Sequence, residues 1–145
     1  MKNKFTILGC GSSLGVPWIN GNYGNCNPKN KKNLRSRCCA HIQYNDISIL
    51  IDTSPDLRFQ IIKNNIKNIN CVFYTHAHAD QTHGINDLRA FYITNRKKIN
   101  IYADEYTSNQ LKKTFGYCFN STFEYPAILK MNKLKKNFKF IDKNK

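Results

Sequence analysis

The stretch from Tyr74 to Gly84, YTHAHADQTHG, holds three of the chain's four histidines together with one aspartate. His76 and His78 are separated by one residue, and alternate side chains of an extended segment share a face, so both imidazoles can reach one ion. Asp80 continues the alternation. Imidazole nitrogen and carboxylate oxygen are suitable ligands for zinc and similar divalent ions. The pattern therefore predicts a metal site formed by His76, His78 and Asp80.

The other two histidines fit this site less well. His83 lies beyond the alternation and is expected to support the ligand residues without binding the ion. His41 falls on a predicted strand and is a poor candidate for a ligand. A catalytic zinc ion needs three protein ligands and an open position for water, and a two-metal site needs further ligands from elsewhere in the chain. The cluster is therefore expected to supply only some of the ligands of a catalytic metal site.

The composition is that of an ordinary globular domain of 145 residues, treated as a single domain over 1–145. No run of eighteen or more apolar residues occurs, so we expect no membrane-spanning helix. The first residues read as a strand and not as a signal peptide, which favours the cytoplasm.

The formal net charge of +14 has two explanations. An anionic partner, such as nucleic acid or a phosphate compound, would select for it. Codon bias would also produce it, because the chain has 18 Lys but only 5 Arg, with 20 Asn and 16 Ile. Arginine is the residue expected on a surface that reads bases or binds phosphate in a bidentate way. Codon bias is therefore the preferred explanation, and both causes can act together.

The six cysteines are irregularly spaced and form no CxxC pair. Without a secretory signal, reduced thiols in a cytosol are expected. Cys26 could form a small metal site with Cys38 and Cys39, but buried or idle thiols are the simpler interpretation.

The elements that position the histidine cluster alternate between strand and helix patterns. Apolar or alternating runs predict strands. Two of these strands, 39–44 and 48–53, are predicted to form a hairpin. A long polar loop over 18–37 precedes them. Helix signals follow, with Ser54 as N-cap, Pro55 at the first helical position and Asp56 in the first turn. Strands are predicted at 5–8, 39–44, 48–53, 69–75 and 98–104, and helices at 54–65, 84–95 and 105–117.

This order predicts an α/β fold with a mixed sheet. In the last helix, Thr107 or Ser108 is expected near the start and Gly116 near the end. The basic segment 126–145 alternates Phe138 and Phe140 with lysines and then gives a turn signal, which predicts a strand that lacks its partner. The domain is therefore expected to be incomplete.

Three ordered motifs together resemble metallo-β-lactamase-fold hydrolases. THAHADQTHGINDLR, from Thr75, resembles their H-x-H-x-D-H signature. ILGCGSSLGVP, from Ile7, resembles their opening strand and glycine loop, and LIDTSPDLR, from Leu50, resembles their buried aspartate motif. The resemblance extends from Phe5 to about Tyr125 and is strongest to the phosphoribosyl cyclic phosphodiesterase branch. The quinone-cofactor biosynthesis protein B and ribonuclease Z share parts of it.

The resemblance implies the N-terminal half of an αββα sandwich. It implies His76 and His78 as ligands of a first Zn²⁺ or Mn²⁺ ion, and Asp80 as a ligand of a second that also orients or deprotonates the attacking water. Asp52 matches an aspartate that supports the histidine loop from behind, with plain capping of a strand end as the alternative. Gln81 stands where the family has a histidine, so the metal is expected to be incompletely coordinated.

The function implied is metal-dependent hydrolysis of a phosphodiester in a small phosphate-ester molecule, weak or absent in this chain alone. The alternative is a non-catalytic remnant, or one piece of a split hydrolase, with residual metal binding. A complementing C-terminal fragment or a homodimer is the expected partner. Nucleic acid is a weaker candidate, because no aromatic and basic binding platform is recognisable.

Overall fold

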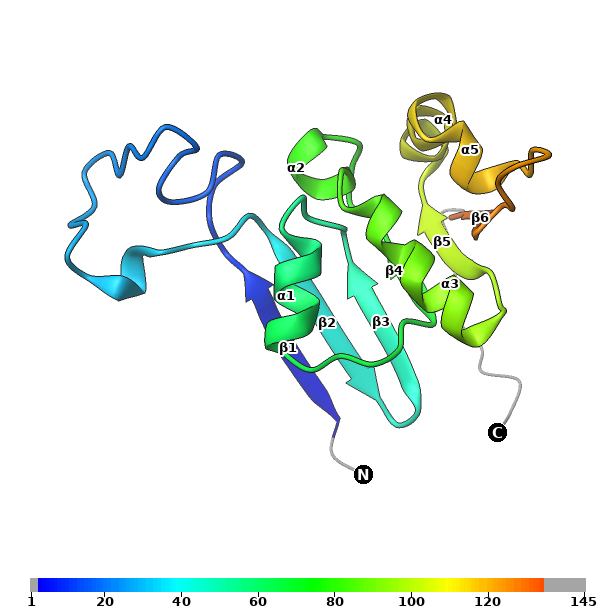
Figure 1. The fold of residues 1–145 in the computed structure, drawn as a ribbon, viewed down its shortest axis with the longest axis horizontal. Coiled ribbons are helices and arrows are strands. Elements are labelled where there is room, and N and C mark those ends of the chain that lie inside the picture. The colour runs from blue at the N-terminus through cyan, green and yellow to red at the C-terminus, as the bar shows by residue number, and fades with distance from the viewer. Residues whose placement is uncertain (1–2, 135–145) are drawn as a thin grey trace.

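The structure is a computed structural model that describes residues 3–134. Its centre is one six-stranded sheet in the order β1-β2-β3-β4-β5-β6 (Figure 1). Strands β1 to β3 pair antiparallel, and β3 to β6 pair parallel, so the sheet is mixed as predicted. The strands are β1 (Lys4–Gly9), β2 (Cys39–Tyr44), β3 (Ile47–Ile51), β4 (Cys71–Phe73), β5 (Ile99–Ala103) and β6 (Leu129–Lys133).

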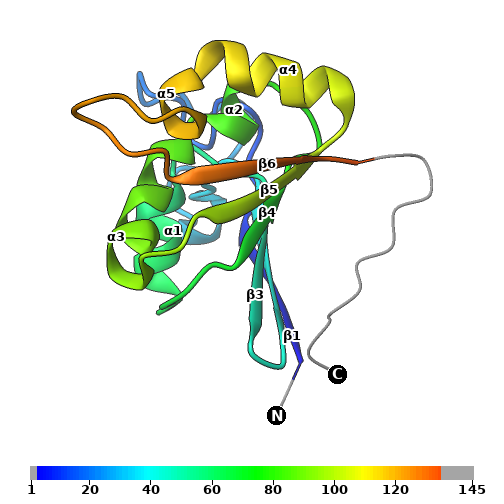
Figure 2. The ribbon, with the colours of Figure 1, turned by 90° about the vertical axis from the view of Figure 1, so that its right-hand side faces the viewer.

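Helices cover one face of this sheet. α1 and α3 lie side by side on that face, and α4 and α5 lie over the end formed by β5 and β6 (Figures 1 and 2). The opposite face carries no helix within residues 3–134 (Figure 2). None of the helices in this range is long and apolar enough to cross a membrane. The helices are α1 (Leu57–Lys63), α2 (Ala79–Thr82), α3 (Arg89–Asn95), α4 (Glu105–Thr114) and α5 (Gly116–Phe119), with 3₁₀ turns η1 (Lys31–Asn33) and η2 (Ile85–Leu88).

The two faces of the sheet differ in burial because successive strand residues point to opposite sides. Leu50, Val72 and Ile101 lie in register on neighbouring strands, point toward the helices and have no exposed surface. Ile49 and Ile51 flank Leu50 on β3 and are only half-buried. The hydrophobic core therefore lies between the sheet and its helices.

The predicted hairpin is confirmed. β2 and β3 pair antiparallel from Ala40 with Ile51 to Tyr44 with Ile47, which leaves a two-residue turn. Asn45 in this turn has a φ of 50°, a left-handed conformation that asparagine adopts more readily than most residues.

The start of α1 was predicted two residues too early. The helix begins at Leu57, and its N-cap residue Asp56 makes no side-chain capping bond, because its carboxylate binds Arg37. The Ser54 hydroxyl still accepts a hydrogen bond, at 3.1 Å, from the Asp56 backbone N–H. The predicted helix over 84–95 is in fact η2 followed by α3.

The predicted helix over 105–117 is also divided. Asp104 is the N-cap of α4, and its carboxylate accepts the Thr107 N–H at 2.7 Å, so Thr107 and Ser108 lie inside the helix. Gly116 begins the short α5. Strand β6 was not predicted; it pairs with β5 and is part of the basic segment 126–145. The strand expected around Phe138 and Phe140 lies outside the described residues.

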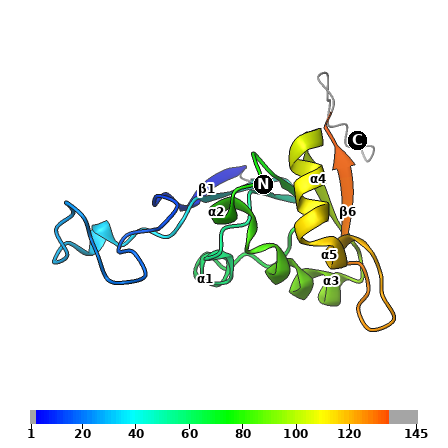
Figure 3. The same cartoon turned by 90° about the horizontal axis from the view of Figure 1, so that it is seen from above.

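The long loop between β1 and β2 was predicted, and within it only η1 is helical. This loop, residues 10–38, extends away from the sheet (Figure 3). Its returning end comes back to the body at the top of β2, beside α1.

Candidate metal centre

The structure brings the three predicted ligands together at the end of β4. One imidazole nitrogen each from His76 and His78 and one carboxylate oxygen from Asp80 all lie within 4.8 Å of one another. The two imidazole rings are 4.6 Å apart and nearly perpendicular. Both histidines are exposed and Asp80 is half-buried, so the donor atoms are open to solvent on one side.

The backbone that carries these side chains differs from the prediction in one respect. His78 is extended and forms the N-cap of α2, but Asp80 lies in the first turn of that helix. The expected alternation along an extended segment therefore ends at His78. The α2 turn nevertheless places the Asp80 carboxylate next to the two imidazoles.

Asp52 holds the start of the histidine loop. It follows β3 with a φ of 63° and is 5% exposed. Its two carboxylate oxygens accept the Thr75 backbone N–H and the Thr75 hydroxyl, each at 2.8 Å. The Thr75 hydroxyl oxygen in turn lies 2.9 Å from His76 Nδ1. Asp52, Thr75 and His76 therefore form one chain of hydrogen bonds.

This chain fixes the proton on His76. The Thr75 hydroxyl has a single hydrogen, which it donates to Asp52, so it can only accept from His76 Nδ1. In the neutral imidazole of His76, Nδ1 then carries the hydrogen and Nε2 has the lone pair that a metal ion needs. Hydrogen bonding of the second ring nitrogen in this way orients histidine ligands in metal sites.

Two effects oppose each other in the pKa of Asp52. Burial raises the pKa of this carboxyl above its usual value, and the two hydrogen bonds from Thr75 partly offset that effect. A positive charge on His76 also lowers the pKa of Asp52, whereas the negative charge of the Asp80 carboxylate raises it.

Thr53 connects the loop to the sheet. Its backbone N–H donates to the Gln81 carbonyl at 2.7 Å, and its own carbonyl accepts the Gly84 N–H at 3.0 Å. Its hydroxyl lies 2.7 Å from the buried Tyr74 hydroxyl. A Cβ atom on Gly84 would lie 2.0 Å from the Ser54 carbonyl oxygen, so only glycine permits this close approach.

Gln81 and His83 occupy different surroundings. The Gln81 side-chain N–H donates to Asp80 Oδ2 at 2.8 Å, so this amide orients the carboxylate. His83 Nδ1 lies 3.1 Å from the Thr82 hydroxyl, and its ring packs edge-on against Phe115. His83 is not part of the donor cluster, and neither is His41, which is buried against Ser48.

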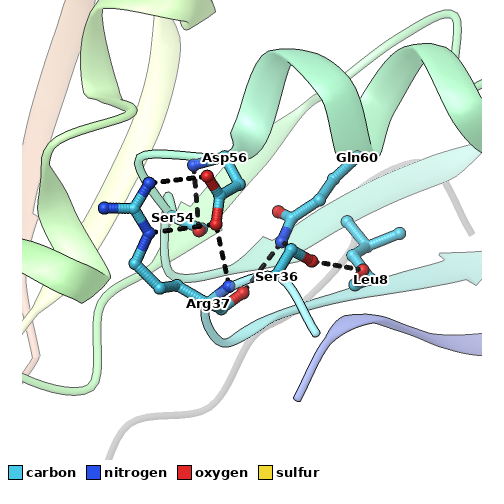
Figure 4. A network of polar contacts seen from close by, with 6 residues as sticks. All are labelled: Leu8, Ser36, Arg37, Ser54, Asp56 and Gln60. Carbon is cyan, nitrogen blue, oxygen red and sulfur yellow. Dashed lines mark hydrogen bonds and ion pairs between the residues drawn. The ribbon is translucent and has the colours of Figure 1, made fainter. Parts of the chain in front are cut away.

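A second polar network, which connects the long loop to the start of α1, was not predicted (Figure 4). The Arg37 guanidinium binds both Asp56 oxygens, at 2.6 and 3.0 Å, and the Arg37 N–H donates to Asp56 Oδ2 at 2.8 Å. The Gln60 amide donates to the Arg37 carbonyl at 2.8 Å and to the Ser36 hydroxyl at 3.0 Å. These bonds attach the returning end of the long loop to α1.

Arg37 and Asp56 shift each other's pKa. The Arg37 guanidinium holds the pKa of Asp56 below its usual value, and hydrogen bonding to Asp56 raises the pKa of Arg37. The Asp80 carboxylate contributes a smaller electrostatic effect on Arg37, so the two side chains are within electrostatic range. Because the Arg37 charge is paired with Asp56, this pair adds no net charge near Asp80.

The cysteines lie outside the donor cluster. Cys39, Cys71 and Cys118 are buried, whereas Cys10, Cys26 and Cys38 are exposed. Among the residues that the structure describes, the histidine–aspartate cluster is the only group of three or more metal-type donors, so no cysteine site accompanies it there.

An open groove of about 820 Å³ runs between the long loop and the β1–α1 side of the body. Leu14, Leu34 and Phe59 form part of its apolar lining. Its charged lining includes Lys31, Arg35, Lys63 and the paired residues Arg37 and Asp56.

Comparison with known proteins identifies the family. A sequence model described as a β-lactamase superfamily domain matches residues 48–141. This chain belongs to the metallo-β-lactamase superfamily of hydrolases. The matched range includes Asp52 and the histidine loop, which the structure joins through Thr75.

Individual relatives agree with this assignment. A crystal structure of a diphosphatase from the PhnP family is 33% identical and superimposes with a TM-score of 0.79 over 94% of this chain and 52% of its own. Zn²⁺-bound PqqB from Methylobacterium extorquens, 18% identical, shares the fold with a TM-score of 0.68 over 96% of this chain and 48% of its own. The short form of human tRNase Z is 16% identical and shares the fold with a TM-score of 0.61, over 91% of this chain and 45% of its own.

A curated relative is 30% identical over 138 residues, covering 92% of this chain and 27% of that protein, an octanoyltransferase of Porphyromonas gingivalis. The chain thus spans about a quarter of this relative and about half of the solved structures that it matches.

Proposed function

We propose that this chain supplies one half of the active site of a metal-dependent, phosphodiesterase-like hydrolase. The observation that carries the proposal is the convergence of donor atoms from His76, His78 and Asp80. The 33% identity with the PhnP-family diphosphatase supports chemistry at a phosphate ester.

The donor set suits a divalent ion such as Zn²⁺ or Mn²⁺. The ion needs neutral imidazole, and in the neutral ring of His76 the Asp52–Thr75–His76 chain favours the tautomer whose lone pair is on Nε2. Zinc–nitrogen bonds are about 2.0–2.1 Å long, so donors of a single ion lie at most about 4 Å apart. A spread of 4.8 Å is therefore suited to one ion after small side-chain rotations, or to two adjacent ions.

A bound divalent ion lowers the pKa of water and polarises a phosphoryl oxygen. Asp80 is the residue of this chain that can take a proton from that water. Gln81 donates to Asp80 Oδ2 and so holds the carboxylate in one orientation. An ionised carboxylate has about four lone-pair sites, so Asp80 can serve as a metal donor and still accept a proton.

The proposed substrate class is anionic. Lys31, Arg35 and Lys63 line a groove that does not include the three donor residues, so these cations can attract an anionic molecule to this side of the chain but do not place it at the donors.

The site has three donors, from His76, His78 and Asp80. Gln81, where the resemblance predicts another histidine ligand, instead donates its side-chain N–H to Asp80. We therefore expect the chain by itself to hydrolyse phosphodiesters slowly or not at all. The alternative, a remnant with metal binding and no catalytic role in any assembly, makes the same prediction for the isolated chain.

The test is hydrolysis of bis-p-nitrophenyl phosphate by the purified chain with Zn²⁺ or Mn²⁺, alone and with a complementing second half. The proposal predicts little turnover alone and a large increase on complementation, which His76→Ala abolishes and His83→Ala leaves intact. A complemented chain that binds metal but shows no turnover would favour the remnant. Fast turnover by the isolated chain would show that its site is complete.

A further inference from the structure

A polar pocket of about 330 Å³ lies on the helix-covered face of the sheet. His41 on β2 pairs with Leu50, whose side chain points toward the helices, so His41 faces the same way. The segment between α1 and β4, residues 64–70, passes over this part of the sheet (Figure 1). We call this space the His41 pocket, and its lining includes Lys4, His41, Asp46, Ser48 and Lys67.

The His41 pocket is separate from the donor cluster of the metal centre. Ser48 lies near the start of β3, whereas Asp52 follows the end of that strand. At about 3.3 Å per residue, the two lie about 13 Å apart. None of the three donor residues lines the pocket. A ligand in the His41 pocket therefore does not depend on the proposed function.

Ser48 holds the His41 imidazole in one orientation. His41 Nε2 lies 2.7 Å from the Ser48 hydroxyl oxygen, and this hydroxyl donates its single hydrogen to the Asn68 carbonyl. The Ser48 backbone N–H donates to Asn70 Oδ1 at 2.7 Å, which keeps Ser48 in place. The Ser48 hydroxyl can therefore only accept from His41, so in the neutral ring Nε2 carries the hydrogen and Nδ1 has the lone pair.

The other ring nitrogen of His41, Nδ1, is an acceptor that faces the pocket. His41 is 6% exposed, and within residues 3–134 its hydrogen bond is made through Nε2 alone. In the same range, Gln60 Oε1 is the one fully buried side-chain polar atom without a hydrogen bond, so Nδ1 keeps access to the pocket. Burial, together with the positive charge of Lys4, lowers the pKa of His41, so the ring is mostly neutral at pH 7.

The charged residues of the lining are mainly cationic. Lys4 and Lys67 form no salt bridge within residues 3–134, and Asp46 is the one acidic residue of the lining. Two lysines and one aspartate leave a net positive charge. The His41 pocket therefore combines cationic donors with a buried, neutral acceptor.

We propose that the His41 pocket binds hydrogen phosphate, whose oxygens accept from Lys4 and Lys67 and whose O–H donates to His41 Nδ1. A ligand for this pocket needs negative charge for the lysines and a hydrogen for Nδ1. Inorganic phosphate has both, because it retains at least one hydrogen near neutral pH. Sulfate has the charge without the hydrogen. A phosphate monoester, with a second pKa of about 6, has mostly lost its hydrogen at pH 7.5.

The experiment is an NMR titration of the full chain with inorganic phosphate, sulfate and glycerol 3-phosphate, at pH 7.5, at one ionic strength and in EDTA. A surface that is merely basic attracts phosphate and sulfate through their charge alone, so it does not prefer phosphate. We expect saturable phosphate binding that is at least fivefold tighter than binding of the other two anions. The ¹⁵N signal of His41 Nδ1 should shift with phosphate, because its lone pair then accepts a hydrogen.

Matched variants locate the bound phosphate. Lys67→Gln should weaken its binding at least threefold, whereas Asp46→Asn should tighten it because the opposing charge is removed. Lys112→Gln, at an exposed position of α4 outside the pocket, should leave it unchanged. His76→Ala should also leave it unchanged, because the donor cluster is elsewhere.

A further variant tests the acceptor. His41→Leu should remove the preference for phosphate over sulfate. If this variant is poorly folded by circular dichroism, Ser48→Ala replaces it, because the loss of the Ser48 acceptor lets either ring nitrogen carry the hydrogen and should reduce the preference.

Equal affinity for phosphate and sulfate would overturn the proposal, and so would the absence of saturable phosphate binding by the folded chain. Phosphate binding that is unchanged in both Lys67→Gln and Asp46→Asn would contradict the assigned pocket. Binding that His76→Ala abolishes would place the phosphate at the donor cluster instead.

Discussion

The two faces of the sheet are formed by the same strands but differ in how far their side chains are buried. On the helix-covered face, Leu50 is fully buried by elements of this chain. On the opposite face, which carries no helix within residues 3–134, its neighbour Ile49 is half-buried. The donor cluster shows a similar contrast: Asp52 and Gln81 hold it from within the chain, whereas the imidazoles are exposed. One face is therefore buried by elements of this chain, and the other is only partly covered within residues 3–134.

The largest expected effect separates the two faces directly. Leu50→Ala should lower the free energy of unfolding by about 3 kcal/mol, because it leaves a cavity in a closed core. Ile49→Ala should cost about 1 kcal/mol or less in the isolated chain, because its side chain is partly in water already. Urea denaturation of both variants measures the difference. Equal losses would mean that the two faces are equally buried.

The hydrogen-bonded side of the metal centre gives the next effect. Thr75→Val removes the hydroxyl that connects Asp52 to His76 while keeping a similar shape. Loss of such outer partners weakens metal binding by about 10- to 100-fold, and we expect about 10-fold for Zn²⁺. Isothermal titration measures it.

Thr94→Val is the control for that variant, because the exposed Thr94 hydroxyl binds only the Ala90 carbonyl of its own helix. Equal zinc affinity in Thr75→Val and the wild type would show that the Thr75 bonds do not position His76.

The pair that attaches the long loop should have the smallest effect, visible in its pH dependence. Because Arg37 lowers the pKa of Asp56 in the folded state, the stabilisation is present above the unfolded pKa of about 3.9 and is lost as the pH falls through the folded value. Asp56→Asn should cost about 1 kcal/mol at pH 7, since the pair is partly screened by solvent.

That variant should also flatten the decline in stability below pH 5, measured by thermal unfolding between pH 3 and 7. Glu105→Gln provides the comparison, because its partner Lys133 and Glu105 itself are well exposed and should contribute nothing measurable. An unchanged acid profile in Asp56→Asn would show that another carboxyl controls it.

Local sequence patterns predicted the features that depend on residues close together in the chain. The hairpin and the alternation of strands and helices follow from periodicity, and the spacing of His76 and His78 places their imidazoles together. Asp80 joins them through the α2 turn, which the predicted alternation did not include.

The start of α1 does not follow from a local pattern, because Asp56 is withdrawn from capping by Arg37, nineteen residues earlier. Strand β6 was missed because its sequence, LKMNK, has only two apolar residues, separated by a lysine and followed by asparagine and lysine, and so lacks the apolar run that identified β4 and β5.

The supporting residues of the site were the hardest to predict. Asp52 was identified through a resemblance, but Thr75, Thr53 and Gly84 were not singled out. A hydroxyl residue directly before His76 and another directly after Asp52 were the available signals. Their roles depend on β3 and β4 being neighbours, a contact between segments more than twenty residues apart.

Zinc titration of the purified chain, followed by isothermal calorimetry, tests the central claim most directly. The account predicts saturable binding that His76→Ala and His78→Ala each weaken at least tenfold and that His83→Ala, at the neighbouring histidine outside the cluster, leaves unchanged. Binding that is insensitive to His76 and His78, or no binding at all by a chain shown to be folded, would contradict it.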